Sequence, residues 1–254
     1  MRAIPDWVIT DQYADTALGV LKSGKEAEVF VVERTRLDGS GRCLLAHKRY
    51  RPRSVKTKGE LETLGFSRAS TFVNDHVYNE GRRFRRSRER RAVERMTDYG
   101  KCILNERWMG FELDVMTRVW QAGGPVPYPV EFAGDGMLLE YIGDDEQAAP
   151  TLGQARLSKA ELASAAEQLV EGLRCLMEVG IVHADLSAFN LLWWDGSLRF
   201  IDFPQAVDLA INPSGLELLH RDIENVTTWF ERRGTRVDPD ALFAELLDIA
   251  YPRR

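Results

Sequence analysis

Three polar residues between His183 and Asp202 have types and spacing that suit phosphoryl transfer. Asp185 lies five residues before Asn190 in HADLSAFN, and Asp202 follows an apolar segment in RFIDF. Phosphoryl transfer needs a carboxylate beside the attacking hydroxyl and metal ions that bridge the phosphates. Magnesium takes carboxylate and amide oxygens as ligands. We therefore expect Asp185 to accept the hydroxyl proton, and Asn190 and Asp202 to bind magnesium, with manganese as an alternative.

A hairpin between the two predicted metal ligands would bring them together. The segment LLWWDGSLRFI has apolar residues on both sides of Asp195–Gly196, a dipeptide typical of tight hairpin turns. Such a hairpin folds Asn190 back beside Asp202. The alternative is a polar loop in which these groups only cap turns. His183 is expected to be a buried, hydrogen-bonded residue that orients the loop, not a proton shuttle.

The segment before this loop predicts a helix. Apolar residues recur at helical spacing over 157–180, with Ser158 as the N-cap, Glu161 at the capping-box position and Gly180 as the C-cap. Beyond Pro213 two more helices are expected, at 216–233 and 238–250.

A site of this kind also needs a lysine on a strand and a glutamate on a helix to hold that lysine. Lys48 in LLAHKRY and Glu112, in a helix expected at 96–121, are the candidates. The alternative for Lys48 is a solvated residue at a sheet edge. A hairpin over 18–34 that turns at Gly24 would cover the phosphates, although it has one glycine where a typical protein kinase has three. Further strands are expected at 43–50 and, as a second hairpin, at 130–143.

The order of elements, strands first and helices later, predicts an α+β fold with a small β lobe and a larger helical lobe. We expect an N-terminal extension at 1–17, an N-lobe at 18–143 and a C-lobe at 144–254. A long segment at 51–95 has few periodic apolar positions and is interpreted as a flexible insertion in the N-lobe.

Composition excludes several classes of protein. The net charge of −5 and 44% hydrophobic residues are ordinary for a globular domain, and no apolar run approaches the roughly 20 residues of a membrane span. The start of the chain lacks the apolar core of a secretory signal, so a cytoplasmic location is expected. The cysteines have no CxxC spacing, which argues against disulfides and structural zinc; they are Cys43, Cys102 and Cys175.

Four stretches resemble the RIO family of atypical protein kinases, and they are closer to its type-1 branch than to the winged-helix type-2 branch. SGKEAEVF resembles the STGKEANVY-like phosphate loop of that family, and HADLSAFN resembles its H-[AG]-D-L-S-x-x-N catalytic loop. IDFPQAV resembles its D-[FV]-[PS]-Q metal loop, and LELLHRDIENVTTWFERRG resembles the helix that follows.

The resemblance implies a two-lobed, protein-kinase-like fold without the activation segment and APE motif of ordinary protein kinases. It implies ATP and Mg²⁺ as cofactors and catalytic roles for Lys48, Asp185 and Asp202. The hinge that meets adenine would be Glu140 to Ile142. The nucleotide-binding residues it implies are Ser23, Gly24, Lys25, Val29, Lys48, Glu112, Glu140, Tyr141, Ile142, Asn190 and Asp202.

The leading hypothesis is ATP- and magnesium-dependent transfer to serine or threonine hydroxyls of an unknown protein substrate, including the chain itself. One alternative is an ATPase-type switch in which Asp202 accepts the phosphate. Another is a small-molecule phosphotransferase of the aminoglycoside or choline type, and a third is a nucleotide-binding pseudokinase scaffold.

An arginine cluster at 82–91, RRFRRSRERR, holds seven arginines in ten residues. Such a run predicts a phosphate-binding patch for RNA, a ribosomal partner or a phosphorylated loop, and the alternative is a solvated helix face. The surrounding insertion is also a candidate for autophosphorylation, at Ser54, Ser67, Ser70, Thr71 or Ser87.

Overall fold

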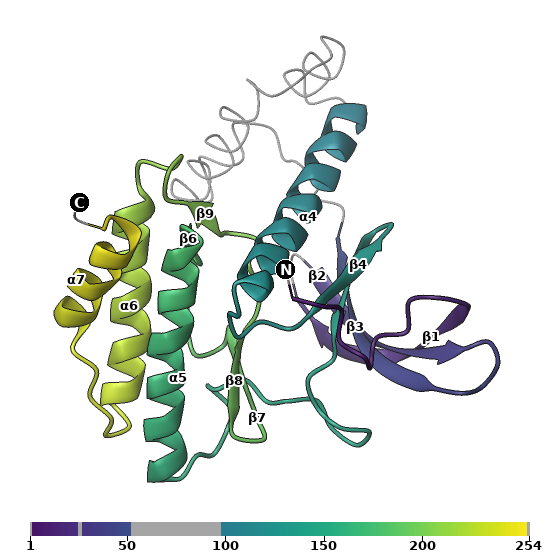
Figure 1. Cartoon of the computed structure of the whole chain (residues 1–254), viewed down its shortest axis with the longest axis horizontal. Helices are drawn as coiled ribbons and strands as arrows, with labels where there is room; N and C mark the ends of the chain where they lie inside the picture. The colour runs from purple at the N-terminus through teal and green to yellow at the C-terminus, as the bar shows by residue number, and fades with distance from the viewer. Residues whose placement is uncertain (1, 25–26, 52–97, 253–254) are drawn as a thin grey trace. The chain divides into compact units, whose positions relative to one another are not determined.

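The computed structural model describes residues 2–24, 27–51 and 98–252 (Figure 1). The chain divides into two compact units, one made of residues 1–50 and 112–254 and the other of residues 51–111. The flexible insertion predicted at 51–95 lies outside the described residues except for Arg51, and the arginine cluster at 82–91 lies outside them entirely. The predicted lobe boundaries therefore stay predictions.

A five-stranded antiparallel sheet forms the first lobe. Its strands lie in the order β1-β2-β3-β5-β4. Their bounds are β1 Tyr13–Ser23, β2 Ala27–Arg36, β3 Arg42–Tyr50, β4 Pro129–Ala133 and β5 Gly136–Glu140. Both predicted hairpins are present. β1 begins at Tyr13, whereas the sequence predicted a start at Leu18. The prediction missed the first residues because the mostly polar start of this exposed edge strand lacks the apolar alternation that marks a strand in sequence.

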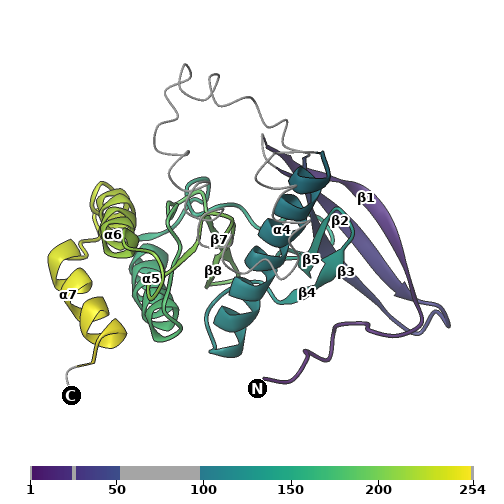
Figure 2. The same cartoon turned by 90° about the horizontal axis from the view of Figure 1, so that it is seen from above.

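The second lobe is mainly helical, with α5 Lys159–Glu178, α6 Gly215–Glu231 and α7 Pro239–Ala250 packed side by side (Figure 2). The capping box of Ser158 and Glu161 is present as predicted. The C-cap of α5 is Val179, and Gly180 is the next residue, where a φ of +70° favours glycine. In the described part of the chain, no helix has the length and apolar character needed to cross a membrane.

Four short strands of the second lobe frame the predicted catalytic residues. They are β6 Ile181–Val182, β7 Leu191–Trp194, β8 Ser197–Phe200 and β9 Val207–Asp208. β7 and β8 form the predicted hairpin, which turns at Asp195 and Gly196 with φ angles of 46° and 69°. β6 pairs with β9, so the segments before Asp185 and after Asp202 lie next to each other.

Helix α4 (Asp98–Gln121) connects the sheet to the helical lobe through its last turns, which belong to the larger unit. Val115, Met116 and Val119 are fully buried. Arg118 donates from Nη2 to the carbonyl of Val179 at the end of α5 (2.8 Å). These contacts fix the C-terminal part of α4, and with it the position of Glu112.

The sheet face opposite Lys48 has its own buried core. Val32, Leu45 and Leu138 form an apolar cluster there, and Val8 and Ile9 of the N-terminal segment are also buried. The predicted N-terminal extension is therefore partly packed against the domain, since the Ile9 carbonyl accepts a hydrogen bond from a buried Arg34 guanidinium (3.2 Å).

Candidate active site

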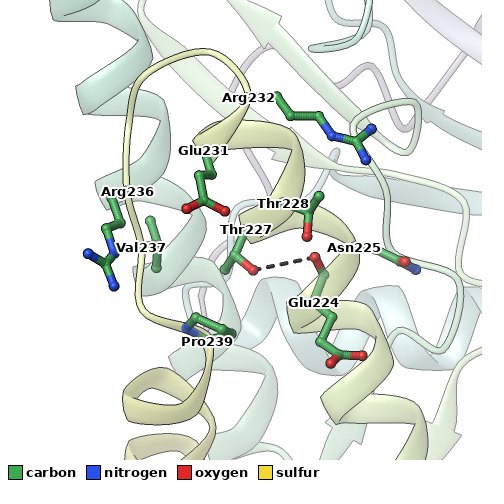
Figure 3. A pocket seen from close by; sticks show the side chains of 9 residues that line it. All are labelled: Glu224, Asn225, Thr227, Thr228, Glu231, Arg232, Arg236, Val237 and Pro239. Atoms are coloured by element: carbon green, nitrogen blue, oxygen red, sulfur yellow. Dashed lines mark hydrogen bonds between the residues drawn. The ribbon is translucent and has the colours of Figure 1, made fainter.

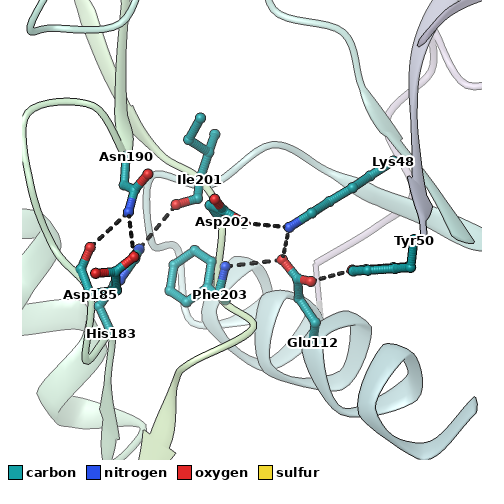
Figure 4. A network of polar contacts seen from close by, with 9 residues as sticks. All are labelled: Lys48, Tyr50, Glu112, His183, Asp185, Asn190, Ile201, Asp202 and Phe203. Carbon is teal, nitrogen blue, oxygen red and sulfur yellow. Dashed lines mark hydrogen bonds and ion pairs between the residues drawn. The ribbon is translucent and has the colours of Figure 1, made fainter. Parts of the chain in front are cut away.

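Lys48, Glu112 and Asp202 meet in one buried network (Figure 4). Lys48 Nζ lies 2.7 Å from Glu112 Oε1 and 2.5 Å from Asp202 Oδ1, and the exposed fractions of Lys48 and Glu112 are 8% and 1%. Burial alone would lower the pKa of Lys48, but the charges of Glu112 and Asp202 raise it above its ordinary value. The lysine is therefore an interior cation and not a solvated edge residue.

Glu112 has two further partners that sequence reasoning did not identify. Its Oε1 accepts the backbone N–H of Phe203 (3.0 Å), and its Oε2 accepts the hydroxyl of Tyr50. Tyr50 follows Lys48 by two residues on β3, so both side chains lie on the same face. The spacing of two residues from Lys48 could have identified Tyr50 from the sequence as a residue on the same face of the strand.

Asp185 and Asn190 form the second part of the site. Asn190 Nδ2 donates to the Asp185 carbonyl (2.7 Å) and to Asp185 Oδ2 (3.2 Å). The Ile201 N–H donates to the Asn190 carbonyl (3.0 Å), which brings Asn190 beside the residue that precedes Asp202. Asp185 itself is exposed. The hairpin thus brings together the three polar residues that the sequence assigns to phosphoryl transfer.

Asp202 is charged and partly open to solvent. Burial raises the pKa of its carboxyl, but Lys48, His183 and Lys22 lower it, and the net shift is downward. Its side chain is 37% exposed, and its backbone has a φ of +70°, which is rare outside glycine. Lys48 thus holds one oxygen of an ionised carboxylate that still has an accessible edge.

The oxygen atoms of Asn190 and Asp202 fit a magnesium ion. The amide nitrogen of Asn190 is turned to Asp185, which leaves the amide oxygen as the atom able to face a cation. Within the described residues, no group of three or more histidine, cysteine, aspartate or glutamate side chains gathers as a metal site. Magnesium commonly uses one or two protein ligands together with substrate phosphates and water.

His183 is buried and hydrogen-bonded, as predicted. Its Nε2 lies 3.0 Å from the Ile201 carbonyl, and its ring centroid lies 4.6 Å from that of Phe203. Burial lowers its pKa to about 4, so the ring is neutral at physiological pH and its Nε2–H donates to the carbonyl. The histidine therefore joins the predicted catalytic loop to the segment after β8 that carries Asp202.

Asp222 on α6 is a positioning residue that the sequence did not single out. Its carboxylate accepts the N–H groups of Ala184 (2.6 Å) and Leu186 (3.1 Å) on either side of Asp185, and the adjacent Arg221 donates to the Ala184 carbonyl. Ala184 has a φ of +63°, a strained value for a residue with a Cβ. Only the aspartate in RDIEN signalled this contact in the sequence.

The predicted phosphate-covering turn is only partly described, because Lys25 lies outside the described residues. The Gly24 N–H donates to the Ala27 carbonyl (2.9 Å), which closes the turn. The Ser23 hydroxyl donates to Glu28 Oε1 (3.1 Å), so this side chain contacts its neighbour on β2. The nucleotide contacts of Ser23, Gly24 and Lys25 stay predictions.

The predicted hinge begins at Glu140, the last residue of β5. Glu140 exchanges two hydrogen bonds with Tyr128: its N–H donates to the Tyr128 carbonyl (2.8 Å), and its Oε2 accepts the Tyr128 N–H (2.9 Å). The Ile142 carbonyl accepts the Ala149 N–H (2.9 Å). Glu140, Tyr141 and Ile142 thus lie on a well-anchored segment, and their contact with adenine stays a prediction.

A pocket of about 520 Å³ lies between α6 and the segment leading into α7 (Figure 3). Glu224, Glu231, Arg232 and Arg236 are among its lining residues, and none of the predicted active-site residues is. Charges of both signs on exposed side chains give it no preference for a phosphate, so it is not the candidate active site.

A family model described as the RIO domain matches residues 70–242, more than half of the chain. The chain belongs to the RIO domain family. The resemblance inferred from the four motifs is confirmed by this match. The α+β, protein-kinase-like fold is confirmed with it, since the RIO domain here has an antiparallel sheet followed by a helical lobe.

Relatives of this RIO domain come from archaea and animals. The RIO-type serine/threonine-protein kinase Rio1 of Haloferax volcanii is 30% identical over 236 residues, which cover 93% of this chain and 70% of that protein. Rio1 of Thermoplasma acidophilum is 33% identical over 135 residues, 53% of this chain and 69% of that protein. Serine/threonine-protein kinase RIO3 of Bos taurus is 36% identical over 130 residues, 51% of this chain but only 25% of that protein.

Proposed function

We propose that this RIO domain transfers the γ-phosphoryl group of ATP to serine or threonine hydroxyls of a protein. The observation that supports this best is the meeting of Lys48, Glu112 and Asp202 in one network beside the hydrogen-bonded pair Asp185 and Asn190. Related RIO proteins are named serine/threonine-protein kinases, which supports the same reaction.

Lys48 is the residue that would hold the phosphates. Its raised pKa keeps the ammonium charged, and Glu112 and Asp202 both contact it. Asp202 and the Asn190 amide oxygen would hold magnesium, which when bound bridges phosphate oxygens and neutralises their charge. Because both metal ligands flank the β7–β8 hairpin, their spacing depends on that hairpin.

Asp185 is the residue that would receive the proton. As the acceptor hydroxyl oxygen bonds to the γ-phosphorus, the bond from that phosphorus to the bridging oxygen of ADP breaks and the hydroxyl proton passes to the Asp185 carboxylate. Asn190 orients this carboxylate through Oδ2, and Asp222 holds the backbone on both sides of it. The exposed Asp185 side chain leaves room for a protein acceptor.

The test is incubation with ATP labelled in the γ-phosphate, alone and with a serine-rich acceptor protein. Label on serine or threonine residues of a protein supports the proposal. Asp185→Asn should lower transfer by about 10²- to 10⁴-fold while ATP affinity is kept. Asp195→Asn, a matched change at the exposed hairpin turn, should leave transfer unchanged.

Other readouts of the same experiment separate the alternatives. Free phosphate without label on serine or threonine, whether or not Asp202 is labelled, would indicate the ATPase-type switch. Label on an aminoglycoside or choline would indicate a small-molecule phosphotransferase. ATP binding with neither product would indicate a scaffold. Autophosphorylation in the 51–95 insertion, RNA or ribosome binding through 82–91 and a cytoplasmic location stay predictions from the sequence.

A further inference from the structure

Lys22 on β1 lies in the same cross-strand row as Lys48. The register of the sheet pairs Lys22 with Val29 on β2, and Val29 in turn with Lys48 on β3. Directly opposed residues of antiparallel strands project to the same face of a sheet. Lys22 therefore projects to the face from which Lys48 reaches Glu112 and Asp202.

The separation within this row suits a shared ligand. Neighbouring strands lie about 4.8 Å apart, so a two-strand step places the Cα atoms of Lys22 and Lys48 on the order of 10 Å apart. Each lysine has a flexible four-carbon stem that can close much of this distance. The two ammonium groups can thus reach one extended anion between them.

The two lysines differ in what they can offer a ligand. Lys48 is buried, and its ammonium already contacts two carboxylates. Lys22 is exposed, beside the turn that is predicted to cover the phosphates. The next residue, Ser23, projects to the other face, where its hydroxyl contacts Glu28. Lys22 is thus the residue of this pair that is directed to the Lys48 side.

We propose that Lys22 binds the terminal phosphates of the nucleotide as a second ammonium group beside Lys48. A triphosphate carries more negative charge than Lys48 can neutralise while it also contacts Glu112, and lysine binds phosphate as a compact point charge. The proposal rests on the proposed function only in taking ATP as the ligand.

The experiment measures the Kd values of ATP, ADP and AMP, each with magnesium, by calorimetry on the whole chain. Lys22→Met should weaken ATP binding about tenfold, ADP binding less, and AMP binding not at all, because the Lys22 ammonium would reach only the outer phosphates. Lys22→Arg should keep most of the ATP affinity. Lys159→Met, the same change at an exposed lysine that begins α5, should change none of the three Kd values.

Two results would overturn the proposal: an unchanged ATP Kd in Lys22→Met, or equal weakening of ATP and AMP binding, which would indicate a general distortion of the site. Binding is measured without transfer, so the two proposals fail separately. A wild-type chain that binds ATP but labels no protein refutes the kinase proposal alone. A wild-type chain that binds no nucleotide refutes both.

Discussion

Arg34 and Lys48 are cations buried on opposite faces of the same sheet, and each contacts two carboxylates and a tyrosine. Arg34 is 1% exposed; its Nε and Nη2 lie 2.8 Å from the two oxygens of Asp15, and Nη2 lies 2.5 Å from Glu131. Its guanidinium also stacks 3.6 Å from the centre of the Tyr13 ring. These partners come from the strands β1 and β4 of the sheet itself.

The partners of Lys48 come from elements outside the sheet. Glu112 lies on α4, and Asp202 lies on the loop after β8 in the helical lobe. Only Tyr50, whose ring centre lies 5.4 Å from the lysine Nζ, comes from the sheet. The Lys48 network therefore joins three parts of the fold, whereas the Arg34 network joins strands of the one sheet and the N-terminal segment.

We propose that this difference separates a structural ion network from a functional one. A guanidinium has a rigid fork of donors that suits a fixed, bidentate contact, whereas an ammonium is a point charge that can pass from a carboxylate to a phosphate. Burial lowers the pKa of Arg34, yet hydrogen bonds to Asp15 and Glu131 more than offset that effect. The two networks are thus alike in charge, burial and pairing. They differ in which elements supply the carboxylates and in how readily the cation can exchange these partners.

The largest effect is expected from Lys48→Met. Loss of the ammonium should lower phosphoryl transfer at least about 10²-fold, because the charge that stabilises the transferred group is gone. Single-turnover assays with labelled ATP would measure it. Unchanged transfer in this variant would place Lys48 with Arg34, as a purely structural cation.

Arg34→Met should give the reverse pattern. It leaves two partly exposed carboxylates without their cation and should lower the free energy of unfolding by about 1.5–3 kcal/mol, while the folded fraction keeps its ATP affinity and transfer rate. Denaturant unfolding combined with calorimetry tests both parts.

Arg36→Met is the matched control on the same strand. The Arg36 side chain is 39% exposed and lies 3.7 Å from Asp11, a surface pair worth at most about 1 kcal/mol. If Arg34→Met abolished ATP binding in protein that remained folded, the assignment of a structural role to Arg34 and a functional role to Lys48 would be wrong.

The comparison of the two networks also shows what sequence reasoning could reach. The Lys48 network follows a spacing of strand lysine, helix glutamate and loop aspartate that is shared with a known family, so the motifs indicated it. The helix start at Ser158 and the turn at Asp195–Gly196 are local features, and local hydrogen bonding explains why their residue types were sufficient.

The Arg34 network and the Asp222 contacts could not be found that way. Arg34 meets Glu131 across 97 residues, and Asp222 meets Ala184 across 38. In sequence, Arg34 lies in an ordinary polar strand segment, ERTR, and nothing local says that its side chain is buried. Burial of a charge is decided by which distant carboxylates reach it, which is tertiary information.

Asp222 provides a third kind of buried charge, in which backbone N–H groups are the nearest partners. Burial raises its pKa to about 6 from an ordinary 3.8, whereas the pKa of Asp202, which contacts a lysine, is lowered. Between pH 3.8 and about pH 6 the folded chain therefore keeps a proton on Asp222 that the unfolded chain has lost. The contribution of Asp222 to stability falls as pH rises from about 4 to about 6 and is constant above.

Asp222→Asn should remove this pH dependence. The difference in unfolding free energy between wild type and variant should shrink by up to roughly 3 kcal/mol from pH 4 to pH 6. Urea unfolding at several pH values measures it. A difference that stays flat, or grows, would show that the carboxylate is ionised throughout and that its backbone partners fully offset burial.

The smallest expected effects come from the two tyrosines, which form a matched pair. Tyr50→Phe and Tyr13→Phe each remove one hydroxyl donor from a carboxylate, of Glu112 and Glu131 respectively, and each should lower the unfolding free energy by about 1–3 kcal/mol. Only Tyr50→Phe should also lower kcat/KM for ATP, about tenfold, because the Glu112 carboxylate can then rotate away from Lys48. Steady-state assays of both variants compare the two faces directly.

A double-variant cycle decides whether Tyr50 acts through Glu112. If it does, Tyr50→Phe should add little to the decrease already caused by Glu112→Gln, since the carboxylate that the hydroxyl orients is gone. Additive decreases would mean that Tyr50 supports the site by packing alone. Equal decreases of kcat/KM in Tyr13→Phe and Tyr50→Phe would mean that loss of a hydroxyl on either face of the sheet disturbs the proposed active site. The two networks would then be parts of one structural unit.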